Sequence, residues 1–111
     1  MDCIFCKIVQ GEMDAKVVYE DEHVLAFRDI NPRAPTHVLV VPRKHIASLA
    51  DAEAQDAELL GRVLLAGAEV ARREGLGAYR TVFNVGAGAG QTVFHLHLHV
   101  LGGRSFSWPP G

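Results

Sequence analysis

The chain has 111 residues, which is enough for one hydrophobic core and too few for two. Hydrophobic residues make up 49% and charged residues 22%, a balance that excludes a disordered, charge-rich chain. The formal net charge of −2 gives no overall attraction to nucleic acid or to an anionic membrane, so any phosphate must be bound by a local site.

The N-terminal residues indicate neither export nor membrane insertion. Met1 to Gln10 contains no basic leader and no long apolar run, and the longest apolar stretch, Val63 to Ala71, is interrupted by Glu69. We therefore expect a cytoplasmic protein with no nucleic-acid partner and no membrane partner. No internal repeat or linker divides the sequence, which predicts a single domain over residues 1–111.

The first residues of the chain predict a short helix followed by a hairpin. Cys3 to Val9 is amphipathic and predicts a two-turn helix ahead of a turn at Gly11. Lys16 to Tyr19 and His23 to Arg28 are β-prone segments on either side of an acidic turn, as in a hairpin.

A buried strand and the one long helix come next. His37 to Val41 is a continuous β-prone run that Pro42 stops. From about Ala54 to Glu74, apolar residues recur at helical spacing, acidic residues lie near the start and arginines near the end. Gly75 then provides a helix stop.

Two further strands are predicted in the C-terminal third, over Tyr79 to Asn84 and Val93 to Leu101, joined by a glycine-rich loop. The element order predicts an α+β fold. We expect a five-stranded antiparallel meander sheet with one short N-terminal helix and one long central helix.

Two cysteines, Cys3 and Cys6, are three residues apart at the N-terminus. A disulfide between residues so close in sequence would not cross-link distant segments of the fold. In a reducing compartment the pair indicates a metal-binding or redox pair rather than a structural disulfide. Two small buried residues are the alternative interpretation.

A row of histidines carries the most specific chemical signal. His95, His97 and His99 alternate with leucines, so on a strand all three imidazoles would share one face, spaced about 6.6 Å apart. A single histidine there would be an ordinary, partly buried residue. Three in register bring titratable rings together opposite an apolar face, and metal binding is the first rival to catalysis.

The loop upstream of this row favours an anion over a cation. Residues 84–92 contain three glycines and no carboxylate, so they offer backbone N–H groups and the Thr92 hydroxyl. A phosphate beside histidines indicates phosphoryl or nucleotidyl transfer. A neutral imidazole at pH 7 is nucleophilic, and a neighbouring imidazolium can protonate a leaving group.

The run from His95 to His99, followed by Val100 and Leu101, resembles the signature of the histidine-triad superfamily. The similarity covers nearly the whole chain; it includes Ile4–Phe5, Phe27–Ile30, Ala34–His37 and the ending Trp108–Gly111. The sequence resembles the histidine-triad nucleotide-binding (Hint) branch, the purine nucleoside phosphoramidases, more than the dinucleoside polyphosphate hydrolases or the uridylyltransferases.

The resemblance implies a covalent mechanism. His97 would attack the α-phosphorus and form a nucleotidyl-histidine, the amine would leave, and water would release AMP. His99 would contact the phosphate and assist proton transfer, while His37 would complete a histidine network. The substrate would be a purine nucleotide, an AMP or GMP conjugate, and no cofactor would be needed for catalysis.

The resemblance also implies a nucleotide pocket. Asp29 would bind the ribose hydroxyls, a role that suits a carboxylate; by pattern alone it is a solvated hairpin end. The other positions comprise apolar residues around the base, which by pattern alone are core, and phosphate contacts near the glycine-rich loop. They are Ile4, Phe5, Ile8, Phe27, Ile30, Leu39, Asn84, Gly90, Gln91 and Thr92.

A homodimer is expected on two grounds. The apolar helix from Leu59 to Val70 and the strand from Tyr79 to Asn84 offer more apolar surface than so small a sheet can cover. The resemblance implies the same, with the tail around Trp108 reaching the partner's site.

The cysteine pair departs from animal-type members of the branch, whereas some similar bacterial members hold zinc with two cysteines and two histidines. By that pattern Cys3, Cys6, His45 and His95 would form a closed tetrahedral site for a structural zinc. His95 would then be structural, and only His97 and His99 would face the substrate.

Three other functions compete with a phosphoramidase. They are a dinucleoside polyphosphate hydrolase, a non-catalytic nucleotide-binding or scaffold protein, and a plain zinc module with metal at the triad itself.

Overall fold

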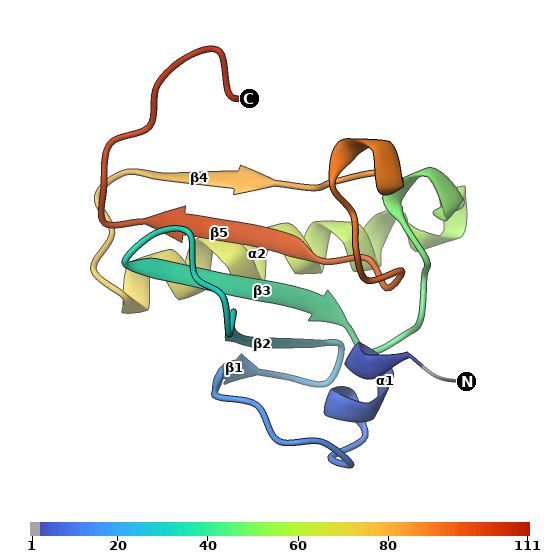
Figure 1. Ribbon diagram of the computed structural model, residues 1–111. Helices are drawn as coiled ribbons and strands as arrows, with labels where there is room; N and C mark the ends of the chain where they lie inside the picture. Colours follow the sequence, from blue (N-terminus) through green and yellow to red (C-terminus); the bar gives the residue numbers. More distant parts are fainter. Residues whose placement is uncertain (1–2) are drawn as a thin grey trace.

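The computed structural model describes residues 3–111, so the part of the predicted domain before Cys3 lies outside the described residues. One five-stranded antiparallel sheet forms the centre of the molecule (Figure 1). The helices and strands of the chain, in sequence order, are α1 Ile4–Val9, β1 Val17–Glu20, β2 Val24–Arg28, β3 Thr36–Pro42, η1 Leu49–Asp51, η2 Ala54–Asp56, α2 Ala57–Arg73, β4 Tyr79–Val82, η3 Ala87–Ala89 and β5 Leu98–Gly102. The predicted fold class and both predicted helices are confirmed.

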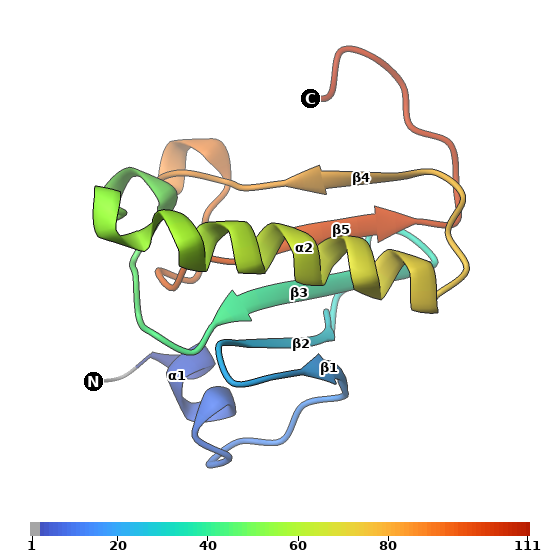
Figure 2. The ribbon, with the colours of Figure 1, turned by 180° about the vertical axis from the view of Figure 1, so that it is seen from behind.

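The strand order corrects the predicted meander. The order in the sheet is β1-β2-β3-β5-β4, so β5 lies between β3 and β4. Because both neighbours of β5 are antiparallel to it, β3 and β4 run in the same direction. The 17-residue helix α2 joins them by crossing one face of the sheet (Figure 2). A helix of that length spans about 25 Å, so it carries the chain back along the whole sheet and leaves the central position to β5.

Alternating side chains divide the sheet into two faces. On one face, α2 buries its apolar side against the strands, with Val63, Ala66 and Val70 packed on Val38 and Leu98. This periodicity was predicted from the sequence. Helix α2 ends before Gly75, which has φ +71°.

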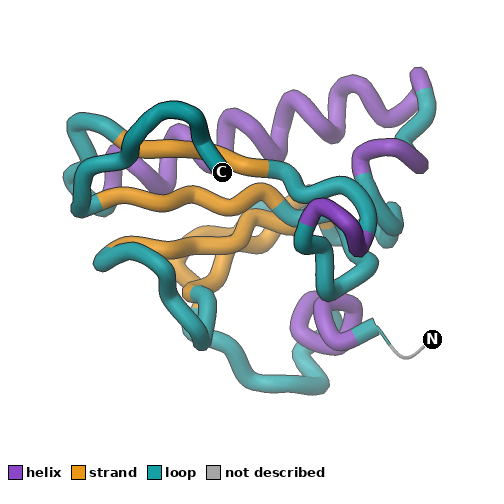
Figure 3. Tube along the Cα trace, turned by 45° about the horizontal axis from the view of Figure 1, so that its top comes forward, coloured by secondary structure: helices purple, strands orange, loops and turns teal. Residues whose placement is uncertain are grey.

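The opposite face holds a second apolar cluster around α1. Phe5 of α1 packs with Leu25, Phe27, Leu39 and Val41 of β2 and β3. Since His37 and Leu39 alternate with the α2-facing residues Val38 and Val40, the functional side chains of β3 face α1 and not α2. The two helices therefore lie on different sides of the sheet, as Figure 3 shows.

The triad strand is shorter than predicted. The sequence predicts a strand from Val93, but β5 begins at Leu98, and His95 and His97 lie in the irregular segment before it. The ladder with β3 ends at the pair Val40 and Leu98, close to Pro42, whose nitrogen has no hydrogen to donate. Strand β4 likewise ends at Val82, short of the predicted Asn84. Within residues 3–111, no helix is long and apolar enough to span a bilayer.

Candidate active site and metal centre

The three histidines belong to two different clusters, although Phe5 of α1 contacts the rings of both His95 and His97. The His95 ring packs against His45, with ring centroids 4.9 Å apart, and lies next to both cysteines. The His97 ring lies 4.9 Å from that of His99, and His99 lies 5.2 Å from His37. The row therefore divides into one histidine in a cysteine-containing cluster and two in a histidine network.

A directional hydrogen-bond chain connects His37 with His99. The backbone N–H of Arg33 donates to Nδ1 of His37 over 3.0 Å, so the proton of the neutral His37 ring is on Nε2. That nitrogen lies 2.9 Å from Nδ1 of His99 and donates to it. The proton of His99 is consequently on its own Nε2, which is buried and has no hydrogen-bond partner among residues 3–111.

His97 is held in the opposite tautomer. Its Nδ1 lies 2.7 Å from the carbonyl oxygen of His95, and because a carbonyl can only accept, Nδ1 carries the proton. The lone pair is therefore on Nε2. The Phe5 ring meets the His97 ring edge to face at 5.1 Å and limits its rotation. The two adjacent rings offer complementary groups, a lone pair on His97 and an N–H on His99.

Burial keeps these rings neutral. Desolvation lowers the pKa of His97 and of His37 below the ordinary histidine value. It also lowers the pKa of His99 to about 4, and the neighbouring His97 and His37 add to the effect. At neutral pH the network therefore contains uncharged imidazoles.

Asp29 lies beside the histidine network. One of its carboxylate oxygens is 3.4 Å from Nε2 of His37, and the other accepts the Asn31 N–H at 2.8 Å. The side chain is 18% exposed, so it can still accept hydrogen bonds from a ligand.

The apolar positions predicted around the base are only partly together. Phe5, Ile8, Phe27 and Leu39 belong to the α1 cluster, and Phe5 contacts both Phe27 and the catalytic candidate His97. By contrast, Ile30 is 92% exposed and Ile4 is 42% exposed. Trp108 is 81% exposed on the C-terminal tail, which extends away from the sheet (Figure 1).

The glycine-rich loop offers fewer free backbone donors than predicted, because the N–H groups of Ala89, Gly90 and Gln91 donate to carbonyls within the loop. Gly86 and Gly90 adopt φ values of +88° and +95°, and Thr92 is exposed. The Gln91 side chain is buried and holds the loop from inside: it accepts the Gly86 N–H at 2.9 Å and donates to the Ala47 carbonyl at 2.8 Å. Asn84 Nδ2 lies close to Gly90, 4.0 Å from where a β-carbon would be. Gln91 is thus a residue that shapes the loop.

Cys3, Cys6, His45 and His95 converge as the resemblance implied. One potential ligand atom of each lies within 4.8 Å of those of the others, and the distance between the two Nδ1 atoms is 3.2 Å. The Nε2–H of His95 donates to the Pro42 carbonyl at 2.8 Å, so its Nδ1 presents a lone pair to the cluster. Two sulfurs and two imidazole nitrogens at these separations fit the tetrahedral coordination of zinc.

Some contributors to the site could not be found in the sequence. Arg33 and Pro42 act through a backbone N–H and a carbonyl, which any residue type can supply. Neither of these contacts has a motif.

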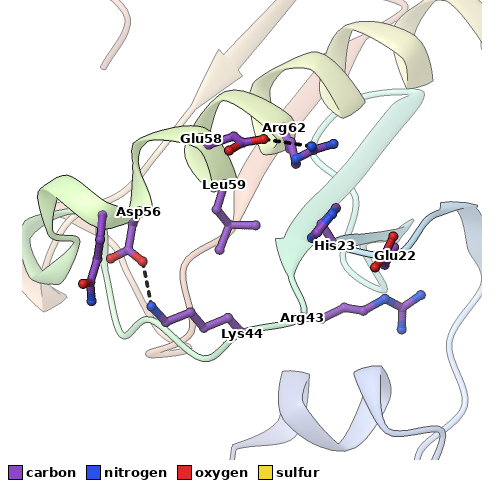
Figure 4. A pocket seen from close by; sticks show the side chains of 9 residues that line it. Glu22, His23, Arg43, Lys44, Asp56, Glu58, Leu59 and Arg62 are labelled. Atoms are coloured by element: carbon purple, nitrogen blue, oxygen red, sulfur yellow. Dashed lines mark hydrogen bonds and ion pairs between the residues drawn. The ribbon is translucent and has the colours of Figure 1, made fainter.

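A separate cleft of about 390 Å³ lies at the start of α2 (Figure 4). Its charged residues are largely paired: Lys44 with Asp56 at 2.7 Å and Arg62 with Glu58 at 2.9 Å. None of the predicted site residues lines it. The predicted site residues and this cleft are therefore separate features of the molecule.

The comparisons with known proteins agree with this geometry. The HIT domain family model matches residues 10–106. An uncharacterized HIT-like protein of Synechocystis is 56% identical, with 99% of this chain and 97% of that protein covered. The 14 kDa zinc-binding protein of Zea mays is 51% identical over 97% of this chain and 87% of its own.

Solved structures show the same fold. A HIT family hydrolase from Legionella pneumophila superposes with a TM-score of 0.97 at 55% identity, covering 99% of this chain and 100% of that one. A histidine triad protein from Clostridium difficile gives 0.93 at 43% identity, covering 96% and 95%. The chain therefore belongs to the HIT domain family.

Proposed function

We propose that the protein hydrolyses the P–N bond of purine nucleoside 5′-phosphoramidates through a covalent nucleotidyl-histidine. The observation that carries the proposal is the tautomer of His97. Its Nδ1–H is fixed on the His95 carbonyl, so the neutral ring keeps a lone pair on Nε2. The low pKa that burial gives this ring maintains the nucleophilic form at neutral pH.

The first step exchanges one bond to phosphorus for another. Nε2 of His97 attacks the α-phosphorus, the P–N bond to the amine breaks, and the amine nitrogen takes up a proton as it leaves. In the second step, water attacks the same phosphorus, the P–Nε2 bond breaks, and the nucleoside monophosphate is released. Overall, one water is consumed for each amine and nucleotide formed.

His99 supplies the complementary group. Its buried Nε2–H has no protein partner in the described chain, and such a donor is costly to leave unpaired. A non-bridging phosphate oxygen or the leaving nitrogen would accept this hydrogen bond. His37 and the Arg33 N–H hold His99 in the donating tautomer, which stabilises charge as it develops.

The substrate class rests on the surroundings of His97. The exposed Thr92 after the glycine-rich loop can donate its hydroxyl to phosphate, Asp29 can accept from ribose hydroxyls, and the α1 cluster offers apolar surface to a base. A dinucleoside polyphosphate hydrolase remains the second candidate, because the same nucleophile could break a P–O bond. A non-catalytic nucleotide-binding protein is the third.

We also propose that Cys3, Cys6, His45 and His95 hold a structural zinc. The convergence of the donors and the preset tautomer of His95 support this, as does the similarity to the zinc-binding protein of maize. Four protein ligands close the coordination sphere, and zinc held in this way stabilises folded structure.

Mass spectrometry of the protein mixed with an adenosine phosphoramidate tests the function. We expect a mass increase of one adenylyl group, located on His97, and turnover faster than that of a diadenosine polyphosphate. His97→Gln should abolish the adduct and most of the turnover but keep measurable AMP binding, because the pocket contacts come from other segments. A His97→Gln protein with near wild-type turnover would refute the mechanism, and AMP binding without any adduct would favour the non-catalytic alternative.

A further inference from the structure

The proposed nucleophile, His97, lies in the irregular segment before strand β5 and not in the sheet. Strand β5 begins at Leu98, so the peptide groups of His95 and His97 make no ladder hydrogen bonds with β3. The Leu96 N–H donates to the Ile46 carbonyl at 2.7 Å, and this bond ties the segment to a loop and not to a strand. Because the Leu96 N–H and the His95 carbonyl belong to one planar peptide group, this bond to the residue after His45 helps to set the direction of the His95 carbonyl, which fixes the tautomer of His97.

The His95 side chain holds the same residue from its other side. It is fully buried, and its Nε2–H donates to the Pro42 carbonyl at 2.8 Å. Its Nδ1 lies 3.4 Å from the sulfur of Cys3 and 3.2 Å from Nδ1 of His45. Both nitrogens of the ring are thus committed, and the carbonyl of the same residue accepts the His97 N–H at 2.7 Å. Side chain and backbone of one residue connect the cysteine–histidine cluster to the nucleophile.

Helix α1 makes a second connection. Cys3 and Cys6 flank Phe5, whose ring packs edge to face against both His95, at 6.1 Å, and His97, at 5.1 Å. A metal ion that joined the cysteines to His45 and His95 would hold α1 against β3, and with it the Phe5 ring against His97.

We propose that His95 is a positioning residue, through which occupancy of the cysteine–histidine cluster by metal sets the tautomer and orientation of His97. The proposal goes beyond a stabilising zinc, because it links the metal site to the reaction through one peptide carbonyl and one aromatic ring. It rests on the proposed function only for its kinetic consequence. The link between the cluster and the His97 tautomer can be measured without any substrate.

The experiment compares the zinc-loaded protein, the same protein after chelation, and His45→Gln, which removes a ligand that does not touch His97. Nitrogen-15 NMR reports the ring tautomer of His97, and metal analysis reports zinc per chain. The zinc-loaded protein should show the Nδ1–H form alone, whereas the chelated protein and His45→Gln should show a mixture of both tautomers.

Kinetics with an adenosine phosphoramidate supply the second readout. Loss of metal should lower kcat on the order of 10- to 100-fold, the usual effect of losing a group that orients a functional residue through another. The KM should change little, since the nucleotide contacts remain. Restoring zinc to the chelated protein should restore both the tautomer and kcat.

Val63→Ala is the matched control, because it removes buried volume on the α2 face, away from the cluster. It should lower the melting temperature and leave the His97 tautomer unchanged. A chelated protein that keeps its amide spectrum and a single His97 tautomer would overturn the proposal. Global unfolding on chelation at low temperature would also overturn it, because the metal would then act on stability alone. If the His97 tautomer depends on zinc as expected but the zinc-loaded protein shows no turnover, the result would instead count against the proposed function.

Discussion

The hydrogen bonds that link Arg33, His37 and His99 all donate in the same direction, because the first donor in the series is a backbone N–H. The Arg33 N–H can only donate, so His37 must accept at Nδ1 and donate at Nε2, and His99 must do the same. His97 is anchored on an acceptor, the His95 carbonyl, and so presents a lone pair. The backbone groups to which His97 and His99 are linked thus give the two rings opposite roles: His99 is a donor and His97 is a nucleophile or acceptor.

The buried His99 ring predicts a pH dependence of stability. Its pKa is about 4 in the folded protein, lowered by desolvation and by the His97 and His37 rings, although Asp29 raises it. In the unfolded chain a histidine titrates near 6.5, so between these values the unfolded state binds more protons. Stability contributed by the neutral ring is therefore present above pH 6.5 and is lost as the pH falls toward 4.

Thermal unfolding of wild type and His99→Gln between pH 7 and 4.5 measures this effect. The melting temperature of the wild type should fall more steeply, because the variant lacks the titrating ring. All other ionisable groups are the same in both proteins, so their contribution is largely removed in the difference. Parallel curves would show that His99 is not held neutral by folding.

Asp29 predicts discrimination at the sugar. If it accepts from both ribose hydroxyls, a 2′-deoxy substrate leaves a partly buried carboxylate without one donor, which costs about 1 to 3 kcal/mol. The specificity constant for deoxy substrates should then be lower by about 5- to 150-fold, and Asp29→Asn should show a smaller ratio. Equal constants for both sugars in the wild type would remove Asp29 from the site.

At the residue level the sequence predicted which side chains are buried better than which side chains face one another. The alternation of histidines with leucines correctly placed Leu96 and Leu98 in the core. It could not show that His95 faces the cysteines, because that depends on where the β3 ladder stops. Nor could it show the Arg33 and Pro42 contacts, because backbone donors and acceptors leave no mark in composition.

At the scale of elements, the contact between α2 and β5 depends on a glycine. The helix contains Gly61 and Gly67, and a glycine inside a helix costs about 1 kcal/mol relative to alanine. A β-carbon at Gly67 would lie 2.9 Å from the side chain of Leu98, which is itself buried, whereas nothing lies within 4 Å of one at Gly61. Gly67 thus permits close packing, and Gly61 does not serve this purpose.

These two glycines make a matched pair of substitutions. Gly61→Ala should stabilise the protein by roughly 0.5 to 1 kcal/mol, since helix propensity improves without a clash. Gly67→Ala should destabilise it by about 1 to 3 kcal/mol, because the methyl group overpacks the interface. Urea unfolding monitored by circular dichroism gives both values. A stabilising Gly67→Ala would mean that Leu98 moves aside without cost.

The element order was readable from the sequence, but the pairing order was not. The spacing of apolar residues predicted α2 and its buried face, because this pattern lies entirely within one segment of the sequence. The insertion of β5 between β3 and β4 is a relation among three segments, and no local pattern encodes it. The antiparallel meander was therefore the simplest wrong choice.

At the scale of the whole molecule, helix α2 exposes two adjacent leucines on the side turned away from the sheet. Leu64 and Leu65 are 49% and 71% exposed, and Tyr79 on the edge strand β4 is 41% exposed. Apolar side chains gathered on a helix and on a neighbouring sheet edge are typical of a protein–protein interface. A second copy of the chain, joined symmetrically, could cover them on both protomers at once.

This surface predicts a homodimer that a single charge should break. Light scattering at low micromolar concentration should give twice the 12.1 kDa mass of the chain. Leu65→Asp should give the monomer mass, because a stable dimer must bury about 1,200 to 2,000 Å² and cannot desolvate an unpaired carboxylate at its centre. Met13→Asp is the control, since Met13 is 39% exposed in the loop after α1, away from α2, and should leave the mass unchanged. A wild type that remains monomeric at these concentrations would rule the dimer out, and the exposed leucines would then need another explanation.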